Sequence, residues 1–189
     1  MVMAGSATKE WTYPMLESLP NDGNRYEIID GELHVTPPPR LRHQGAAWEL
    51  SRLIANYLDQ YPAAGKGFFA PGDVIIDQRN VVEPDVFVIP RTNPMPADWK
   101  DISSLLLAIE VISPSSARRD RGKKRLLYQR YGVAEYWIVD PPARLIERWR
   151  PDDERPEILT DAIEWQPAER YPPLLIELPA FFAKVHGEA

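Results

Sequence analysis

The chain has 189 residues, which suits one domain with short appendages. It contains no cysteine, which excludes disulfides and cysteine-ligated zinc, and its net charge of −6 argues against a protein that coats nucleic acid through bulk charge. No apolar stretch approaches the roughly 20 residues that a membrane span needs. The N-terminal sequence MVMAGSATKEW also lacks the apolar segment of a signal peptide. We therefore expect a cytoplasmic protein with no membrane partner.

The first third of the chain predicts a hairpin that is followed by a long helix. Residues 11–24 suit a short helix and a loop. Residues 25–37 read as two short strands around Asp30-Gly31, a dipeptide typical of two-residue hairpin turns. Apolar residues then recur at helical spacing over residues 42–61, which predicts an amphipathic helix.

The middle of the chain predicts three strands. Residues 67–78 and 81–89 are rich in β-branched and aromatic residues, and a tight turn at Arg79-Asn80 would join them. Residues 104–113 form a third strand that is apolar enough to be central in a sheet. Glu83-Pro84-Asp85 interrupts the second strand, a position where proline usually marks an edge or a bulge.

The remaining elements alternate between helix and strand. They are a helix over 117–131, strands over 134–141, 144–151 and 173–178, and a terminal helix over 179–185. A strand, helix and strand in succession form a crossover that makes parallel neighbours, whereas the hairpins supply antiparallel pairs. We therefore predict one α/β (α+β) domain over residues 25–189, with a mixed sheet flanked by helices, and a helix/loop appendage over residues 1–24.

Two carboxylates stand in apolar surroundings, Asp85 in the second of the three strands and Glu110 in the third. A buried carboxylate is unfavourable unless it is paired or holds a metal. Each residue alone has an ordinary explanation, such as a loop cap or an ion pair. Together, on neighbouring strands, they could share Mg²⁺, which accepts one or two carboxylates, keeps several waters and can activate one of them.

A basic segment follows the third strand. Residues 118–125 hold six basic residues and one acid, a net charge of +5. Charge alone suggests a solvated helix face. Lys124, however, shares a helical stripe with Leu127, Tyr128 and Tyr131, whose large side chains predict that the stripe faces the sheet. The Lys124 ammonium could then reach Glu110, or it could extend to solvent while its stem packs.

Several stretches, in chain order, resemble the Uma family of proteins that are described as restriction endonucleases. They are RYEIIDGEL (25–33), His43 at a helix start, EPDVFV (83–88), IEVISPSS (109–116), Asp120 with Lys124 and Tyr128, and GVAEYWIVDP (132–141). The Pro-Asp pair and the glutamate on the next strand are also similar to the PD-(D/E)xK nuclease signature. The lysine position of that signature, two residues after Glu110, holds Ile112. The Uma pattern has its lysine on the following helix, where this chain has Lys124.

The resemblance implies a restriction-endonuclease-like fold with an N-terminal β-hairpin and a C-terminal strand and helix. It implies hydrolysis of DNA phosphodiester bonds with Mg²⁺, or Mn²⁺ in its place. Asp85 and Glu110 would bind the metal, Lys124 would stabilise the attacking water or the phosphate, and Glu27 would be an accessory acid. Glu27 could equally form a salt bridge within the hairpin.

Further residues are candidates for contact with DNA. His43 matches the family pattern and could touch substrate, although a histidine at a helix start is more often a cap or a packing residue. Glu49 could supply another acid. We expect a phosphate-binding edge made by Arg118, Arg119, Arg121 and Lys123.

The functional alternatives are a non-catalytic module of the same fold that binds nucleic acid or protein, and a hydrolase acting on a small phosphorylated molecule. The second would suit the acidic net charge. For a nuclease that cuts both strands, a two-fold homodimer is expected.

Overall fold

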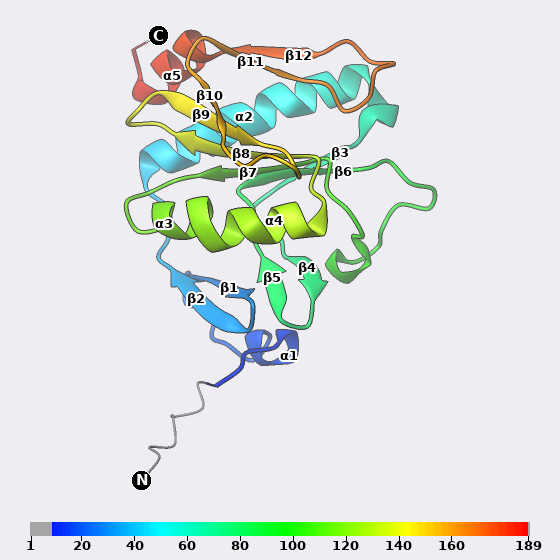
Figure 1. Cartoon of the computed structure of the whole chain (residues 1–189), viewed down its shortest axis with the longest axis vertical. Helices are drawn as coiled ribbons and strands as arrows, with labels where there is room; N and C mark the ends of the chain where they lie inside the picture. Colours follow the sequence, from blue (N-terminus) through cyan, green and yellow to red (C-terminus); the bar gives the residue numbers. More distant parts are fainter. Residues whose placement is uncertain (1–8, 189) are drawn as a thin grey trace.

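A six-stranded mixed sheet forms the centre of the computed structural model, which describes residues 9–188 (Figure 1). Its order is β10-β9-β8-β7-β6-β3. The strands are β3 (Lys66–Phe69), β6 (Val86–Ile89), β7 (Leu107–Val111), β8 (Glu135–Asp140), β9 (Leu145–Trp149) and β10 (Glu157–Leu159). β7 and β8 pair in parallel, and the other neighbours pair antiparallel. The predicted mixed sheet is confirmed, and its parallel pair is the one that the predicted crossover helix connects.

Helices cover both faces of this sheet (Figure 1). On one face lie α2 (Leu41–Gln60) and α5 (Leu178–His186). On the other lies one continuous helical segment made of α3 (Ala117–Arg119), the π-helical turn η3 (Asp120–Lys124) and α4 (Arg125–Tyr131). It ends at Gly132, whose φ of 73° is a left-handed conformation that glycine adopts easily. A two-stranded sheet of β11 (Ala162–Trp165) and β12 (Leu174–Glu177) lies over α2.

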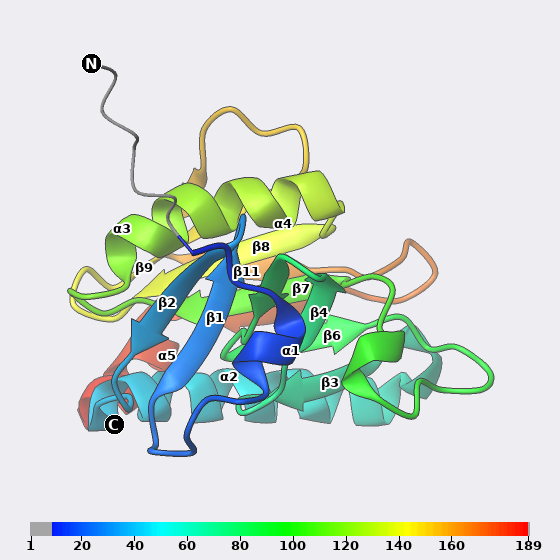
Figure 2. The same ribbon diagram turned by 90° about the horizontal axis from the view of Figure 1, so that it is seen from below.

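A second, smaller sheet has the order β2-β1-β5-β4 and lies on the α4 side of the molecule (Figures 1 and 2). Its strands are β1 (Arg25–Ile29), β2 (Glu32–Thr36), β4 (Val74–Asp77) and β5 (Asn80–Val82). The hairpin of β1 and β2 turns at Asp30 and Gly31, both with positive φ, as predicted. The short helix α1 (Tyr13–Leu16) packs Leu16 against this sheet. Single 3₁₀ turns lie at η1 (Pro62–Ala64) and η2 (Trp99–Asp101).

The prediction of two long strands over 67–78 and 81–89 is wrong. Each stretch divides between the two sheets: β3 and β6 pair in the central sheet, and β4 and β5 pair in the small one. The chain leaves the first sheet at Pro71 and crosses between sheets again at 83–85. Proline has no amide hydrogen for a strand ladder, so both crossings fall beside a proline. The acidic segment 151–165 contains both β10 and β11, which its sequence pattern did not predict because both strands are short and partly charged.

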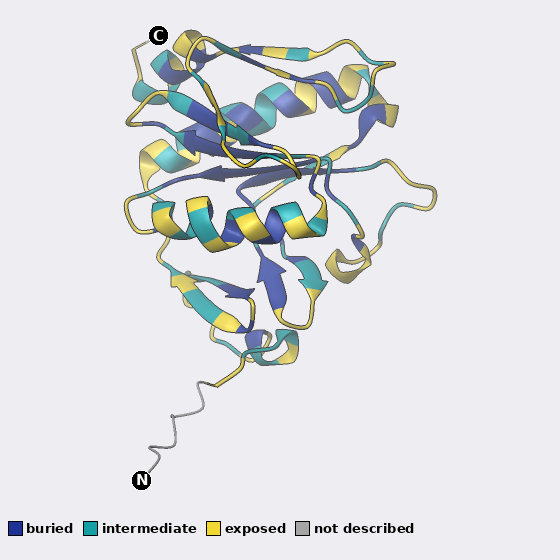
Figure 3. Ribbon diagram, viewed as in Figure 1, coloured by how far each residue is buried: buried dark blue, intermediate teal, exposed yellow. Residues whose placement is uncertain are grey.

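The two faces of the central sheet carry separate cores. On β7, Leu107, Ile109 and Val111 belong to the core beneath α2 and α5, whereas Ala108 belongs to the core beneath α4. Strand side chains alternate, so Glu110 points toward the α4 side. Figure 3 shows the central strands buried along their length. No helix within residues 9–188 is long and apolar enough to cross a membrane.

Candidate active site

Lys124 lies at the centre of a buried cluster of charges. Its Nζ is 2.6 Å from Glu110 Oε1 and 2.6 Å from Glu27 Oε1, and its side chain is 1% exposed. The π-helical turn presents both Asp120 and Lys124 to the interior. π-Turns are rare and occur often at functional sites. The lysine therefore reaches Glu110 as the helical stripe predicted, and it does not extend to solvent.

Glu27 links the small sheet to this helix. It lies on β1, and its Oε1 also accepts a hydrogen bond of 2.8 Å from the backbone N–H of Glu83. Its Oε2 is 3.6 Å from Arg119 Nη2 and has no hydrogen-bond partner among the described residues. Burial raises the pKa of Glu27, but the charges of Lys124 and Arg119 outweigh burial and lower it. Glu27 is therefore ionised, with partners on the helix and not within its own hairpin.

Glu110 is the second carboxylate that contacts Lys124, and its ionised form is less favourable than that of Glu27. Burial raises its pKa well above the ordinary range; Lys124 opposes this shift, and the nearby carboxylates of Asp85, Asp120 and Glu27 add to it. Tyr128 Oη donates a hydrogen bond of 3.0 Å to Glu110 Oε1. These surroundings favour the protonated form of Glu110, and a cation bound beside it would favour the ionised form instead.

Asp85 lies directly before β6 and is held on three sides. Its Oδ1 accepts a hydrogen bond of 2.8 Å from Arg25 Nη1 and is 3.0 Å from His43 Nε2, and its Oδ2 accepts one of 2.7 Å from the Val111 backbone N–H. Burial would raise the pKa of Asp85, but the contacts with His43 and Arg25 bring it down to about 2. Asp85 is therefore ionised at neutral pH. The bond to Val111 fixes it beside the strand that carries Glu110.

Asp85 and Glu110 line one cavity of about 420 Å³. Arg25, His43 and Arg119 line it as well, together with the loop of residues 113–116. Such a volume falls within the range of small-ligand sites. The two carboxylates that the sequence singled out thus share one solvent-connected space, although 24 residues separate them along the chain.

This donor set fits a divalent cation that keeps part of its water shell. Both polar contacts of Glu110 within residues 9–188 go to Oε1, which leaves Oε2 available. Asp85 could exchange its contact with Arg25 or His43 for a cation. In the described part of the chain, no group of three or more Asp, Glu, His or Cys side chains forms a complete metal cage. Two carboxylates with several waters is nevertheless a usual way to hold Mg²⁺.

The four residues of the expected phosphate-binding edge have different surroundings. Arg119 lines the cavity. Arg121 turns away from it and pairs with two carboxylates on β8 and β9, at 3.0 and 2.6 Å. Lys123 pairs with Glu32 on β2. Arg118 is exposed and makes no ion pair with a described residue. The structure therefore brings one of the four to the cavity and leaves Arg118 free to meet a ligand from solvent.

Glu49, the other candidate acid, lies apart from this cluster. It is on α2, where its Oε1 is 2.6 Å from Arg52 Nη2 and 3.2 Å from Lys184 Nζ. Since it does not line the cavity with Asp85, it belongs to a surface ion-pair group.

Arg25 is a site residue for which sequence reasoning assigned no role. Besides Asp85, it contacts Glu83, with Nε 2.7 Å from Oε1. Its position at the first residue of β1 gave no hint of a role, because a charged residue at a strand end is usually solvated. Its partners lie 58 and 60 residues further along the chain, so the role emerges only when the small sheet packs against the central one.

Comparisons with known proteins identify the family and the fold of the chain. Residues 13–178 match the family model Uma2, which is described as "Putative restriction endonuclease". A similar solved structure is that of "a putative nuclease belonging to DUF820 from Anabaena variabilis ATCC 29413", with a TM-score of 0.77 and 18% identity over 92% of this chain and 98% of that chain. At this identity the likeness shows a shared fold, which confirms the predicted fold class. No curated protein matches the sequence. Because the family match spans most of its length, the chain belongs to the Uma2 family, and the resemblance found in its sequence is confirmed.

Proposed function

We propose that this protein is an endonuclease that hydrolyses DNA phosphodiester bonds with the help of Mg²⁺, or of Mn²⁺ in its place. One observation carries the proposal: a fully buried lysine stands 2.6 Å from a carboxylate that shares a cavity with a second carboxylate. Burying three charges in this way is unfavourable for stability and is rarely kept without a functional reason. Membership of the Uma2 family supports a nuclease, and DNA is the substrate we assign.

Asp85 and Glu110 would hold the cation, which supplies Lewis acidity and an activated water when bound. Lys124 would stabilise the negative charge that develops on the phosphate oxygens. Burial lowers the pKa of its amine, but Glu110 and Glu27 raise it above the usual value, so Nζ carries its proton at neutral pH. Because Nζ is already oriented, it stabilises this charge without reorganisation. Glu27 would position Lys124, and Arg119 would bind a phosphate at the cavity wall.

Cleavage and metal binding test the proposal separately. Supercoiled, linear and single-stranded DNA are incubated with the protein and Mg²⁺ or Mn²⁺, and Asp85→Asn serves as the variant that should lose cleavage. Titration calorimetry with Mn²⁺ should give binding heat for the wild type and not for Asp85→Asn. Absence of cleavage on every DNA, combined with absence of binding heat, would exclude the proposal.

The acidic net charge and the paired state of Arg121 and Lys123 favour a second candidate, a hydrolase of small phosphorylated molecules. Salt dependence separates the two. DNA affinity should fall with salt concentration with a log–log slope of about −0.9 for each phosphate contact to a duplex, or about −0.7 to a single strand. The affinity of a small phosphate ester should change much less.

We further propose that the enzyme cuts duplex DNA as a homodimer, because two antiparallel strands present two bonds related by a two-fold axis. Light scattering at working concentration measures the mass. A protein that cuts both strands while it stays monomeric would contradict this part of the proposal.

A further inference from the structure

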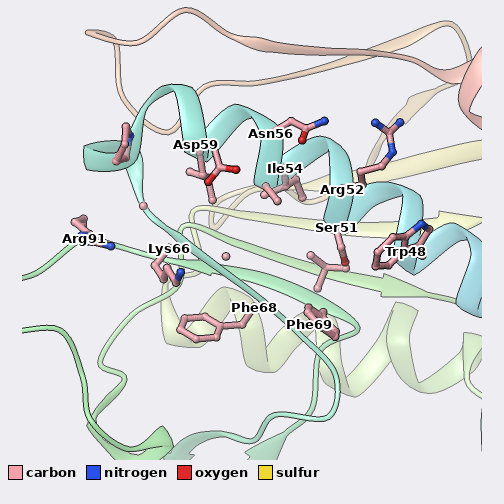
Figure 4. Close-up of a pocket in the computed structure, with 16 residues that line it drawn as sticks. Trp48, Ser51, Arg52, Ile54, Asn56, Asp59, Lys66, Phe68, Phe69 and Arg91 are labelled. Carbon is pink, nitrogen blue, oxygen red and sulfur yellow. The ribbon is translucent and has the colours of Figure 1, made fainter.

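A groove lies between α2 and β3 (Figure 4). Its volume is about 400 Å³. Trp48 and Ser51 project into it from α2, and Phe69 faces them from β3. A neighbouring hollow is lined by these same three residues and also by His43 and Asp85. The groove therefore adjoins a hollow that reaches His43 and Asp85.

Two large aromatic rings are unusually exposed in this groove. Trp48 is 66% exposed and Phe69 is 63% exposed. The alternation of β3 explains the second value: Phe68 points to the α4 side and stacks on Phe87, whereas Phe69 points to the α2 side beyond the cover of the helix. Trp48 lies on the outer side of α2, whose inner side fills the core. Both rings are mostly exposed, so both walls of the groove offer an aromatic face to a ligand.

The charges around the groove fit an anionic ligand. Lys66 and Arg91 line it with a single carboxylate, Asp59, although the whole protein has a net charge of −6. Arg52 lines it as well, but it is paired with Glu49. Within residues 9–188, neither Lys66 nor Arg91 forms an ion pair. Figure 4 shows Lys66 and Arg91 at the end of the groove away from Trp48. An occupant with a flat aromatic part at one end and a negative charge at the other would suit this lining.

We propose that this groove binds an unstacked nucleobase of a single-stranded segment beside the cleaved bond, with a neighbouring phosphate near Lys66 and Arg91. The inference rests on the proposed function and names its substrate class more closely. Aromatic side chains bind single strands by stacking on bases of any sequence. Trp48 follows His43 by five residues of α2, which is about 7.5 Å along the helix axis. This length corresponds to roughly two nucleotide steps of 3.4 Å, so a base at Trp48 would lie about two nucleotides from a phosphate beside His43. A base within a regular duplex cannot enter the groove unless it leaves its stack. The groove therefore favours DNA that has an unpaired segment beside the cleaved bond, such as a flap or an unpaired end of a duplex.

Binding without cleavage tests this inference. Fluorescence anisotropy in EDTA measures the affinity for a labelled 12-nucleotide single strand and for the matching duplex. Trp48→Ala and Phe69→Ala should each weaken single-strand binding by roughly 5- to 150-fold, the range that corresponds to loss of one stacked base. Duplex binding should change less than about twofold. Trp48→Phe should keep most of the affinity, and a 2-aminopurine in the strand should be quenched by the wild type and not by Trp48→Ala.

Leu175→Ala is the matched control, because Leu175 is a half-exposed apolar residue on β12, outside the groove. It should leave both affinities unchanged. Wild-type affinity for the single strand in both aromatic variants would overturn the inference, and so would equal losses for single strand and duplex. A dimer that becomes monomeric in Trp48→Ala would identify the groove as a subunit interface instead. Tight single-strand binding by a protein that neither cleaves DNA nor binds Mn²⁺ would leave the groove assignment intact and remove the nuclease proposal.

Discussion

The two faces of the central sheet use the same strands for different purposes. Beneath α2 and α5, β7 contributes Leu107, Ile109 and Val111 to an apolar core. Beneath α4, the alternate residues of the same strand include Glu110, which meets Lys124 in a cluster that holds more carboxylates than lysines. One strand can therefore serve both faces because its side chains alternate. Over the five residues of β7, the side chains on one face belong to an apolar core, whereas Glu110 on the other face belongs to a charge cluster.

The energetic consequence differs between the faces. Apolar burial stabilises the fold roughly in proportion to the area removed from water. A buried ion pair contributes little in net terms, because desolvation of both charges offsets their attraction, yet removal of one partner is strongly destabilising. Apolar cores on both faces therefore stabilise the domain, and the α4 face retains in addition a charge cluster that this stability makes tolerable.

The largest effect is expected at Lys124. Lys124→Ala should lower turnover by about 10²–10³-fold, since one electrostatic stabiliser of the transition state is lost. It should also lower the free energy of unfolding by about 3–5 kcal/mol, because Glu27 and Glu110 would lose their buried partner. Single-turnover cleavage and urea unfolding measure the two effects.

Two further variants separate the effect on turnover from the effect on the free energy of unfolding. Lys123→Ala is the control for Lys124→Ala, because Lys123 is exposed and pairs only at the surface; both quantities should stay near wild type. In the triple variant Lys124→Met, Glu27→Gln and Glu110→Gln, stability should recover while cleavage does not. Recovery of both would mean that the charges serve folding alone.

On the α2 face, we expect a substitution to lower the stability by a comparable amount without lowering the cleavage rate. Phe182 on α5 is fully buried against the α2 core. Phe182→Ala should lower the free energy of unfolding by about 3–5 kcal/mol, because it leaves a cavity. The cleavage rate per folded molecule, measured below the melting temperature, should remain unchanged. A reduced rate in the fully folded variant would show that the two faces are coupled.

A smaller effect is expected at the exposed end of the basic segment. If Arg118 contacts a phosphate, Arg118→Ala should flatten the log–log dependence of DNA affinity on salt by about 0.9 for a duplex. Lys123→Ala is again the control, since its partner Glu32 already neutralises it. An unchanged slope for Arg118→Ala would mean that this residue is only solvated.

The smallest effect concerns Glu135, a carboxylate on the α2 face that contacts Arg148 and Trp137. Burial raises the pKa of Glu135, although the hydrogen bond from Trp137 Nε1 and the charge of Arg148 oppose it. A raised pKa in the folded state favours the protonated form, so the contribution of Glu135 to stability is present at acidic pH and is lost as pH rises through the raised value. Glu135→Gln keeps an acceptor for Trp137, and it should stabilise the protein at pH 8 but not at pH 4. Thermal melts at both pH values measure the difference, and an equal effect at both would contradict the assigned cause.

The sequence by itself determined the local elements and the identity of the main charged residues. Asp30-Gly31 specified the hairpin turn, and the stripe of Lys124, Leu127 and Tyr128 specified which side of its helix faces inward. Alternation within 104–113 made Glu110 an inward carboxylate. These features depend on residues within one or two turns of each other, so their periodicity is visible along the chain.

The tertiary structure alone decided which partners those residues meet. Asp85 is oriented by Arg25 and His43, 60 and 42 residues away, and Glu27 reaches Lys124 only because the small sheet packs against the α4 side. The division of two apparent strands among four strands in two sheets was equally hidden, because each piece is short and could pair in either sheet. Such contacts depend on the register and packing of the whole domain, and the free energy that selects them is summed over many distant residues that no local pattern records.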